Sequence, residues 1–203
     1  MESLICEPGP KNPLVFLSLS IVNRVPSYKP DEKETLNQLE CMYDLINNVS
    51  AVAFRVDSVK TAVAVAVDAL LSVSSTEAKK SVNVRVSALK CLLLLTEKLA
   101  ACGINCFFDI MPGILSKTLK VIINRVEVEV DTIINLALEV QFRIIQCFWL
   151  EQEYWSEGDD VLLKQKYRNN IDLVICSLKP LIKCERLVQF DNLICNIFKV
   201  HLD

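Results

Sequence analysis

The sequence contains few of the residues that enzyme active sites use most. It has one histidine, His201, at the third position from the C-terminal end, and four glycines that are isolated from one another. The glycine spacing excludes the G-x-G-x-x-G and G-x-x-x-x-G-K-[ST] loops that bind nucleotide phosphates. A histidine on a fraying terminus is a poor proton carrier, so histidine-dependent nucleophilic catalysis is not expected. We predict that the chain is not an enzyme and has no cofactor.

Acid–base chemistry by paired carboxylates is the enzymatic alternative that the sequence leaves open. Glu127, Glu129 and Asp131 are close together in the sequence. On a helix, however, residues two positions apart point in different directions, so these side chains are not expected to converge. A buried cluster of acids in the folded chain would favour such an enzyme, for example a helical hydrolase.

Cysteine usage indicates a reducing compartment and no metal site. The nine cysteines are an odd number, and the N-terminal apolar segment has too little positive charge and too much proline for a secretory signal. Cys102 and Cys106 form the one close pair, without a second pair or a histidine to complete four zinc ligands. We expect free thiols, no bound metal, and a cytoplasmic location, with which a nuclear one is also compatible.

The hydrophobic fraction is high for a soluble protein, but it is not concentrated in long runs. Hydrophobic residues make up 52% and charged residues 23% of the chain. No uncharged run approaches the ~18 residues that a transmembrane helix needs, so no membrane association is predicted. The net charge is −3 and the cations are scattered, whereas binding a phosphate backbone requires a cationic face. Nucleic acid is therefore not an expected partner.

The stretch SVNVRVSALKCLLLLTEKLAACG, residues 81–103, tests whether the chain favours strands or helices. Its first three valines alternate as in a strand. A helix of about twenty residues explains the whole segment better, because the apolar residues form two adjacent stripes and the polar residues a third face. The stripes are Val86, Leu89, Leu93 and Ala100, and Ala88, Leu92, Leu95 and Leu99; the polar face holds Asn83, Ser87, Lys90 and Glu97.

The same period recurs along the chain from residue 31 onward. Residues 31–48 place Leu36, Leu39, Tyr43 and Ile46 on one stripe, and residues 57–75 do the same with Val59, Ala62, Val63, Ala66, Leu70 and Val73. Further helices are predicted over residues 107–122 and 128–149, and from near 161 and 187. Most of the prolines lie in residues 1–30, which we expect to be a loosely structured lead-in with at most one short helix, over residues 14–25.

Helices that begin near residues 58, 106 and 161 are each followed by a partner helix, which gives a repeat of about fifty residues. We therefore predict an all-α fold in which residues 31–203 form an α-solenoid of HEAT/armadillo-like antiparallel helix pairs. A compact irregular helical bundle is the alternative.

The segment CFWLEQEYWSEGDD, residues 147–160, is the most unusual candidate surface. It interleaves aromatic and acidic side chains, and aromatic rings with a polar rim are typical of protein interfaces. We predict a partner-binding site at Trp149, Glu151, Glu153, Tyr154 and Trp155. The alternative is that the tryptophans pack between repeats and that the acids form a solvated loop.

Three segments, in this order, resemble a known family of helical-repeat proteins. VRVSALKCLLLL, residues 84–95, is similar to the second helix of a HEAT repeat, and IMPGIL, residues 110–115, to the proline-containing first helix of the next. The third, EYWSEGDDVLLKQKYRNNIDLVI, places a tryptophan after an acidic break. Together they resemble the N-terminal half of the Tti-one subunit family of the Triple-T cochaperone complex, over roughly residues 80–180.

The resemblance implies a noncatalytic scaffold. It would bind the other Triple-T subunits and, with a heat-shock chaperone, assist the maturation and stability of phosphatidylinositol-3-kinase-related kinases. Members of this family are much longer, so we expect a fragment, a short isoform or a degenerate paralogue; the apolar ending NLICNIFKVHLD lacks the polar cap of a terminal repeat. Another α-solenoid adaptor, acting in transport or on chromosomes, is the alternative.

Overall fold

The computed structural model describes residues 6–7, 9–25, 30–102, 110–125, 129–152, 161–179, 188, 192 and 194–197. Within these ranges the chain forms α-helices and short 3-10 helices, without a β-strand. The predicted all-α fold is therefore confirmed. The chain divides into two compact units, Met1–Phe107 (unit 1) and Phe108–Asp203 (unit 2), and each is described by itself.

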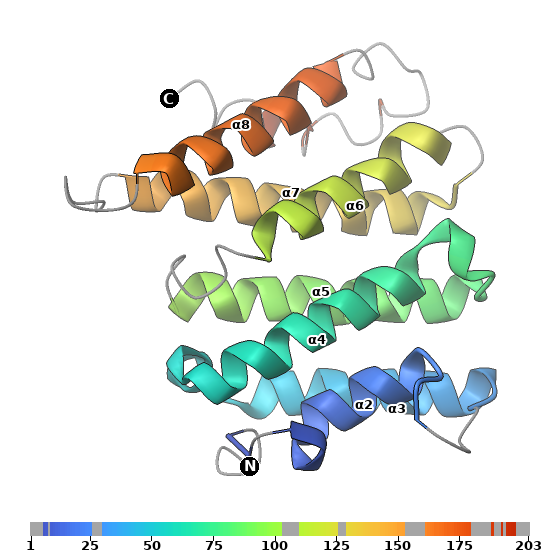
Figure 1. Cartoon of the computed structure of the whole chain (residues 1–203). Coiled ribbons are helices and arrows are strands. Elements are labelled where there is room, and N and C mark those ends of the chain that lie inside the picture. Colours follow the sequence, from blue (N-terminus) through green and yellow to red (C-terminus); the bar gives the residue numbers. More distant parts are fainter. Residues whose placement is uncertain are drawn as a thin grey trace. The chain divides into compact units, whose positions relative to one another are not determined.

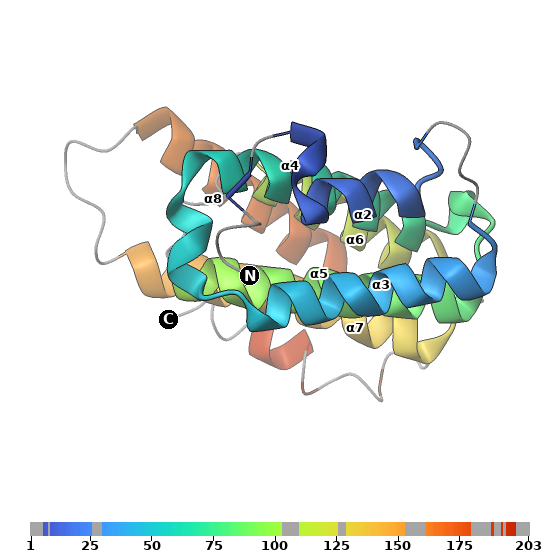
Figure 2. The same ribbon diagram turned by 90° about the horizontal axis from the view of Figure 1, so that it is seen from below.

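Unit 1 contains two layers of helices. α2 (Pro13–Ile21) and α4 (Asp57–Ser74) lie side by side in one layer, and α3 (Glu32–Asn48) and α5 (Val82–Cys102) lie side by side in the other (Figures 1 and 2). Successive α-helices run in opposite directions, so that α3 and α5 are parallel. The short 3-10 helices of this unit are η1 (Gly9–Lys11), η2 (Ala51–Arg55) and η3 (Thr76–Ala78).

The core of unit 1 forms where the apolar stripes of the two layers meet. Every residue of the stripe predicted for α4 is buried, as are Ala88, Leu92, Leu95 and Leu99 of α5. α3 differs from its prediction. Leu39 and Ile46 are buried, but Tyr43 is 40% exposed, and the remaining buried positions are occupied by Thr35 and Met42.

The N-terminal segment contains the short helix that the sequence suggested. α2 covers part of the predicted short helix, and its Leu14 and Ile21 are fully buried in unit 1. Asn12 caps this helix, because its side-chain oxygen accepts hydrogen bonds from the backbone N–H groups of Leu14 (2.9 Å) and Val15 (3.4 Å). Pro13 occupies the first turn, where a missing N–H costs nothing. The short helix expected within residues 14–25 is therefore present, from Pro13 to Ile21.

Three helices of unit 1 end on carbonyl groups that accept hydrogen bonds from cations of neighbouring elements. The Lys98 ammonium donates to the carbonyls of Asn47 (2.8 Å) and Val49 (3.0 Å), at the end of α3. Arg85 donates to the Ser74 carbonyl at the end of α4 (3.0 Å), and Arg55 donates twice to the Cys102 carbonyl at the end of α5 (3.2 and 3.0 Å). None of these helices has a basic residue in its own last turn. These cations therefore act on the negative ends of the helix dipoles.

Unit 2 contains α6 (Met111–Arg125), α7 (Asp131–Gln152) and α8 (Val161–Leu178), and α6 packs against both of the others. Apolar residues at helical spacing on α7 are buried, namely Ile133, Ala137, Val140 and Ile144, whereas Val130, which the same spacing would place on this stripe, is 39% exposed. The helices predicted to begin near residues 58, 106 and 161 correspond to α4, α6 and α8. The first residues of these three helices, 57, 111 and 161, are thus spaced by about fifty residues, as predicted.

Candidate functional site

The partner-binding site predicted from the sequence lies outside the part of the chain whose side chains the structure describes. Trp149 and Glu151 belong to the last turns of α7, but their side chains are not among the described ones. Glu153, Tyr154 and Trp155 lie beyond the end of this helix and outside the described residues. That site stays a prediction.

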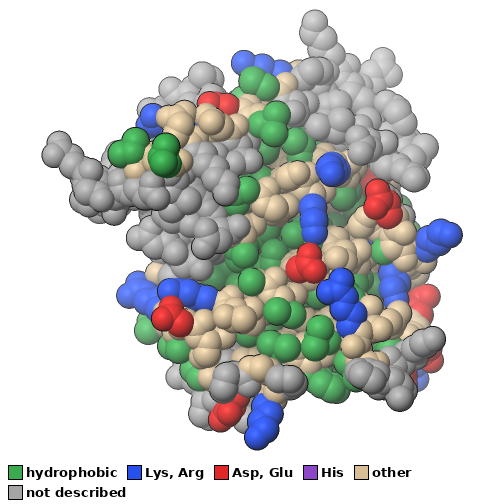
Figure 3. Space-filling view, in the orientation of Figure 1, with side chains coloured by type: hydrophobic (Ala, Val, Ile, Leu, Met, Phe, Trp, Pro, Cys, Tyr) green, Lys and Arg blue, Asp and Glu red, His purple; other side chains and the backbone are tan. Residues whose placement is uncertain are grey.

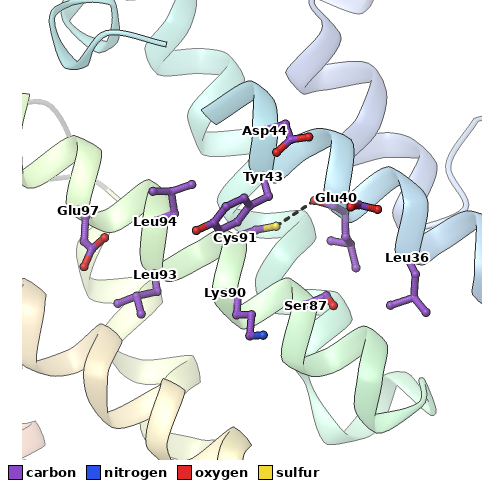
Figure 4. A pocket seen from close by; sticks show the side chains of 11 residues that line it. Leu36, Glu40, Tyr43, Asp44, Ser87, Lys90, Cys91, Leu93, Leu94 and Glu97 are labelled. Carbon is purple, nitrogen blue, oxygen red and sulfur yellow. Dashed lines mark hydrogen bonds between the residues drawn. The ribbon is translucent and has the colours of Figure 1, made fainter. Parts of the chain in front are cut away.

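A groove with a volume of about 800 Å³ lies between α3 and α5 in unit 1 (Figure 4). We call it the α3/α5 groove. Both helices contribute apolar and charged side chains to it. The lining residues are Leu36, Leu39, Glu40, Tyr43 and Asp44 from α3, and Ser87, Lys90, Cys91, Leu93, Leu94 and Glu97 from α5.

The parallel arrangement of the two helices sets the register of the groove. The Cys91 thiol donates to the Leu39 carbonyl (3.2 Å), and Lys98 donates to the Asn47 carbonyl about two turns further along. The sequence separations of these two pairs, 52 and 51, are almost equal. Residues of α3 therefore face residues of α5 about fifty positions later, along the whole groove.

The groove has a buried apolar floor and a partly exposed apolar wall. Leu39 and Cys91 are buried, whereas Leu36, Leu93 and Leu94 are half-buried. Tyr43 is 40% exposed, and its ring extends from α3 across the groove toward Leu94 (Figure 4). An aromatic ring held open beside apolar side chains is typical of a residue that anchors a protein partner.

The rim of the groove is predominantly acidic. Glu40, Asp44 and Glu97 are exposed carboxylates, and Lys90 is the one cation among the lining residues. Neither Glu40 nor Asp44 forms an ion pair within the described part of the chain. Lys98 follows Glu97 directly, but its ammonium is bound to the end of α3. The charged residues that line the groove are thus three carboxylates and one cation.

The cysteine in the floor is chemically quiet. Burial raises the pKa of the Cys91 thiol to about 12. Only the thiolate is a strong nucleophile or metal ligand, so this group remains a neutral thiol near neutral pH. Cys91 contributes apolar surface and one hydrogen bond, to Leu39, which joins the two helices.

A second, smaller cavity of about 270 Å³ lies between α4 and the start of α2. Two of its polar lining residues already have structural roles: Asn12 caps α2, and Ser58 donates to the Cys6 carbonyl (3.0 Å). On the face of unit 1 over α2 and α4, single basic and acidic side chains are interspersed with apolar ones (Figure 3). The α3/α5 groove is the better candidate because apolar anchors and a predominantly acidic rim coincide there.

Other kinds of site find no support in the described residues. No group of three or more His, Cys, Asp or Glu side chains in them could hold a metal ion. Glu129 is buried, but Asp131 is exposed, and Glu127 lies outside the described residues. Among the helices searched, none is both long and apolar enough to cross a membrane.

Sequence reasoning missed the α3/α5 groove because it assigned Leu36 and Tyr43 to the core stripe of α3. A signal was present. Thr35, Leu39, Met42 and Ile46 already form a complete stripe with helical spacing. Leu36 and Tyr43 widen the apolar arc beyond that stripe, and the excess indicates either a second packing partner or an open apolar surface.

The antiparallel helix pairs, the repeat of about fifty residues and the open groove define an α-helical repeat protein of the α-solenoid class. A comparison with protein families matches residues 14–172 to the family described as the TTI1 N-terminal TPR domain. The chain belongs to this family, which confirms the resemblance to the N-terminal region of Tti-one. The match begins within α2, which the predicted lead-in of residues 1–30 had excluded from the array. Comparisons with curated proteins and with solved structures found no match.

The family description names the repeat as TPR, whereas the sequence pattern favoured HEAT. Both repeats are antiparallel helix pairs that stack into a solenoid. They differ in length, since TPR units have about 34 residues and HEAT or armadillo units about 40–47. The spacing of about fifty residues in this chain explains why sequence reasoning favoured the longer unit.

Proposed function

We propose that this chain acts as a noncatalytic interaction scaffold in a Triple-T type cochaperone assembly. In this role it binds other Triple-T subunits and, with a heat-shock chaperone, assists the maturation and stability of phosphatidylinositol-3-kinase-related kinases. The family match over residues 14–172 is the observation that carries the proposal. The helix pairs and the open α3/α5 groove support an interaction role, because recognition in helical-repeat proteins uses extended surfaces.

The proposed role agrees with a cytoplasmic location, with which a nuclear one is compatible. It requires no cofactor, and the absence of enzymatic activity stays a prediction. The partners would be proteins, and neither nucleic acid nor membrane has a part in the proposal.

Affinity purification tests the assignment. The full chain, tagged and expressed in cells, is purified from extract, and bound proteins are quantified by mass spectrometry against a helical-repeat protein of unrelated family. We expect enrichment of Triple-T subunits and of at least one kinase of the phosphatidylinositol-3-kinase-related group. Recovery of transport or chromosome-associated proteins instead would support the alternative adaptor role and contradict this proposal.

A direct binding measurement complements the extract experiment. Purified chain is mixed with the other purified Triple-T subunits, and complex formation is followed by size-exclusion chromatography with light scattering. A stable complex is expected. Absence of binding in both experiments would overturn the proposed function.

A further inference from the structure

We propose that the α3/α5 groove binds an amphipathic helix of a partner protein that carries basic residues beside its apolar anchors. This inference deepens the proposed function. It rests on that function only in assuming that the chain recognises other proteins, and it does not require the partner to be a Triple-T subunit.

The shape of the groove favours a helix as its occupant. The lining residues of α5, from Ser87 to Glu97, span about 15 Å at a rise of ~1.5 Å per residue. This length matches two to three turns of a helix lying along the groove. Addition of a peptide strand to an open sheet edge finds no support, because the described residues of this chain contain no strand. An amphipathic helix that places apolar anchors at helical spacing into a hydrophobic groove is an established mode of recognition, and the apolar wall and length of this groove suit it.

The apolar part of the groove supplies positions for such anchors. Leu36 and Tyr43 are seven residues apart on α3, and Leu94 faces Tyr43 from α5 (Figure 4). Leucine-sized side chains of a partner helix at positions i, i+3 or i+4, and i+7 would meet this wall turn by turn. The half-buried leucines and the exposed ring leave apolar surface that such anchors would cover.

The charge of the rim selects a basic helix. Glu40 and Asp44 are four residues apart, so both carboxylates lie on the same side of α3. Three cations elsewhere in unit 1, at residues 55, 85 and 98, are bound to helix ends and are not in the groove lining. A second copy of the chain is a less favourable occupant, because the chain itself has a net charge of −3.

Synthetic helical peptides test the charge preference directly. Three fluorescein-labelled peptides share leucines at i, i+4 and i+7 and differ only in flanking residues, which are lysine and arginine, glutamine, or glutamate. Fluorescence anisotropy with the full chain is expected to show tightest binding for the basic peptide and weakest for the acidic one. Added salt should weaken the basic peptide most, because exposed charges are screened over about 10 Å at 0.1 M salt. Equal binding of the three peptides, or none, would overturn the proposal.

Paired variants locate the binding site. Glu40→Lys and Asp44→Lys are each expected to weaken the basic peptide about fivefold to tenfold, since one attraction becomes a repulsion. Glu77→Lys, an exposed acid on η3 outside the groove, makes the same change in net charge and should leave the affinity within twofold. Tyr43→Ala should also weaken binding, whereas Phe16→Ala, which removes a 50% exposed ring from α2, should not. Equal effects within either pair would contradict the assignment.

Two further measurements separate this inference from its competitors. Sedimentation of wild type and Tyr43→Ala should give the same oligomeric state; a loss of self-association in the variant would identify a second copy as the occupant and overturn the proposal. Recovery of Triple-T subunits from extract is measured with the same variants. Peptide binding without recovery of Triple-T subunits would contradict the proposed function but not the groove proposal. Recovery of these subunits without peptide binding would contradict the groove proposal but not the proposed function.

Discussion

The helices α3 and α4 have similar lengths but differ in how many of their residues are buried. α4 has 18 residues, of which ten are buried, including four small alanine or serine side chains that allow close packing. α3 has 17 residues, of which four are buried. α4 packs between α2 and α5 within unit 1, whereas the exposed side of α3 carries the acids and the open wall of the groove. The comparison indicates that α4 stabilises the unit and that α3 provides its recognition surface.

The two helices begin differently, because α4 follows Val56 and has no side-chain hydrogen bond at its N-cap, whereas α3 has a complete one. α3 begins with a capping box, in which the Asp31 side chain accepts from the Glu34 N–H (2.8 Å) and the Glu34 carboxylate accepts from the Asp31 N–H (3.3 Å). Such a cap stabilises the helix without help from the core. It allows α3 to keep its helical form while more of its residues remain exposed.

The largest expected effect is a core truncation in α4. Leu70→Ala removes a fully buried side chain and should lower the free energy of unfolding by about 2–5 kcal/mol. Leu36→Ala, in the groove wall of α3, removes a half-buried side chain and should cost below about 1 kcal/mol. Urea denaturation followed by circular dichroism measures both. Similar losses at the two positions would show that α3 is as important for stability as α4.

The second effect is a loss of stability at alkaline pH caused by Cys91. Its thiol has a pKa of about 12 in the folded chain, against 9.0 for the unperturbed group, because burial disfavours the thiolate. Between these values the unfolded chain releases the proton and the folded chain keeps it. Stability is therefore intact below pH 9 and should fall above it, by at most about 1.4 kcal/mol per pH unit from this group.

The variant Cys91→Ala isolates that contribution. Other cysteines, lysines and tyrosines also titrate above pH 9, so the quantity of interest is the difference in slope between wild type and variant. We expect a shallower decline in the variant, measured by urea denaturation at several pH values from 8 to about 11. Identical slopes would show that the thiol is already solvated in the folded chain.

The accuracy of the predictions made from the sequence also differs between the two helices. Every residue of the apolar stripe predicted for α4 is buried. α4 packs against helices on two sides, so nearly all of its apolar residues belong to the core. For α3 the helix bounds were predicted closely, but Tyr43 was assigned to the core although it is exposed. An apolar residue on a surface and one in a core look alike in sequence. Only the neighbouring helix decides which it is.

The groove and the helix ends were not predictable for a related reason. Lys98 and Asn47 are 51 residues apart, and no local pattern pairs them. The register between α3 and α5, which creates both this cap and the groove, is a tertiary property. Family resemblance was more informative than periodicity here, because it depends on the order of segments along the chain and not on any single contact.

A medium effect on stability is expected at the C-terminal end of α3. Lys98→Met keeps the apolar stem but removes the donor to the Asn47 and Val49 carbonyls, and should cost about 1 kcal/mol of stability. Lys90→Met, on the exposed side of α5, the helix that also carries Lys98, should change stability by less than about 0.5 kcal/mol. Thermal or urea unfolding compares them. If both variants are equally stable, the ammonium contacts contribute nothing beyond what water supplies.

The smallest expected effect is the most informative about the groove. Asp44 lies four residues before the end of α3, where a carboxylate gains nothing from the negative end of the helix dipole. Asp44→Lys should therefore leave the free energy of unfolding within about 0.5 kcal/mol of wild type, with any change toward a gain. Repulsion from Lys98, bound at the same helix end, limits that gain. Urea denaturation with Glu77→Lys as the control measures it.

The result for Asp44 decides what its charge is for. If the variant retains wild-type stability but loses the basic peptide, the carboxylate serves recognition, because no folding defect accompanies the lost affinity. A loss of more than about 1 kcal/mol would instead mean that Asp44 supports the fold, since exposed substitutions without a structural role seldom cost so much. The acidic rim of α3 would then belong with the buried stripe of α4 as a feature of stability, and the contrast between the two helices would disappear.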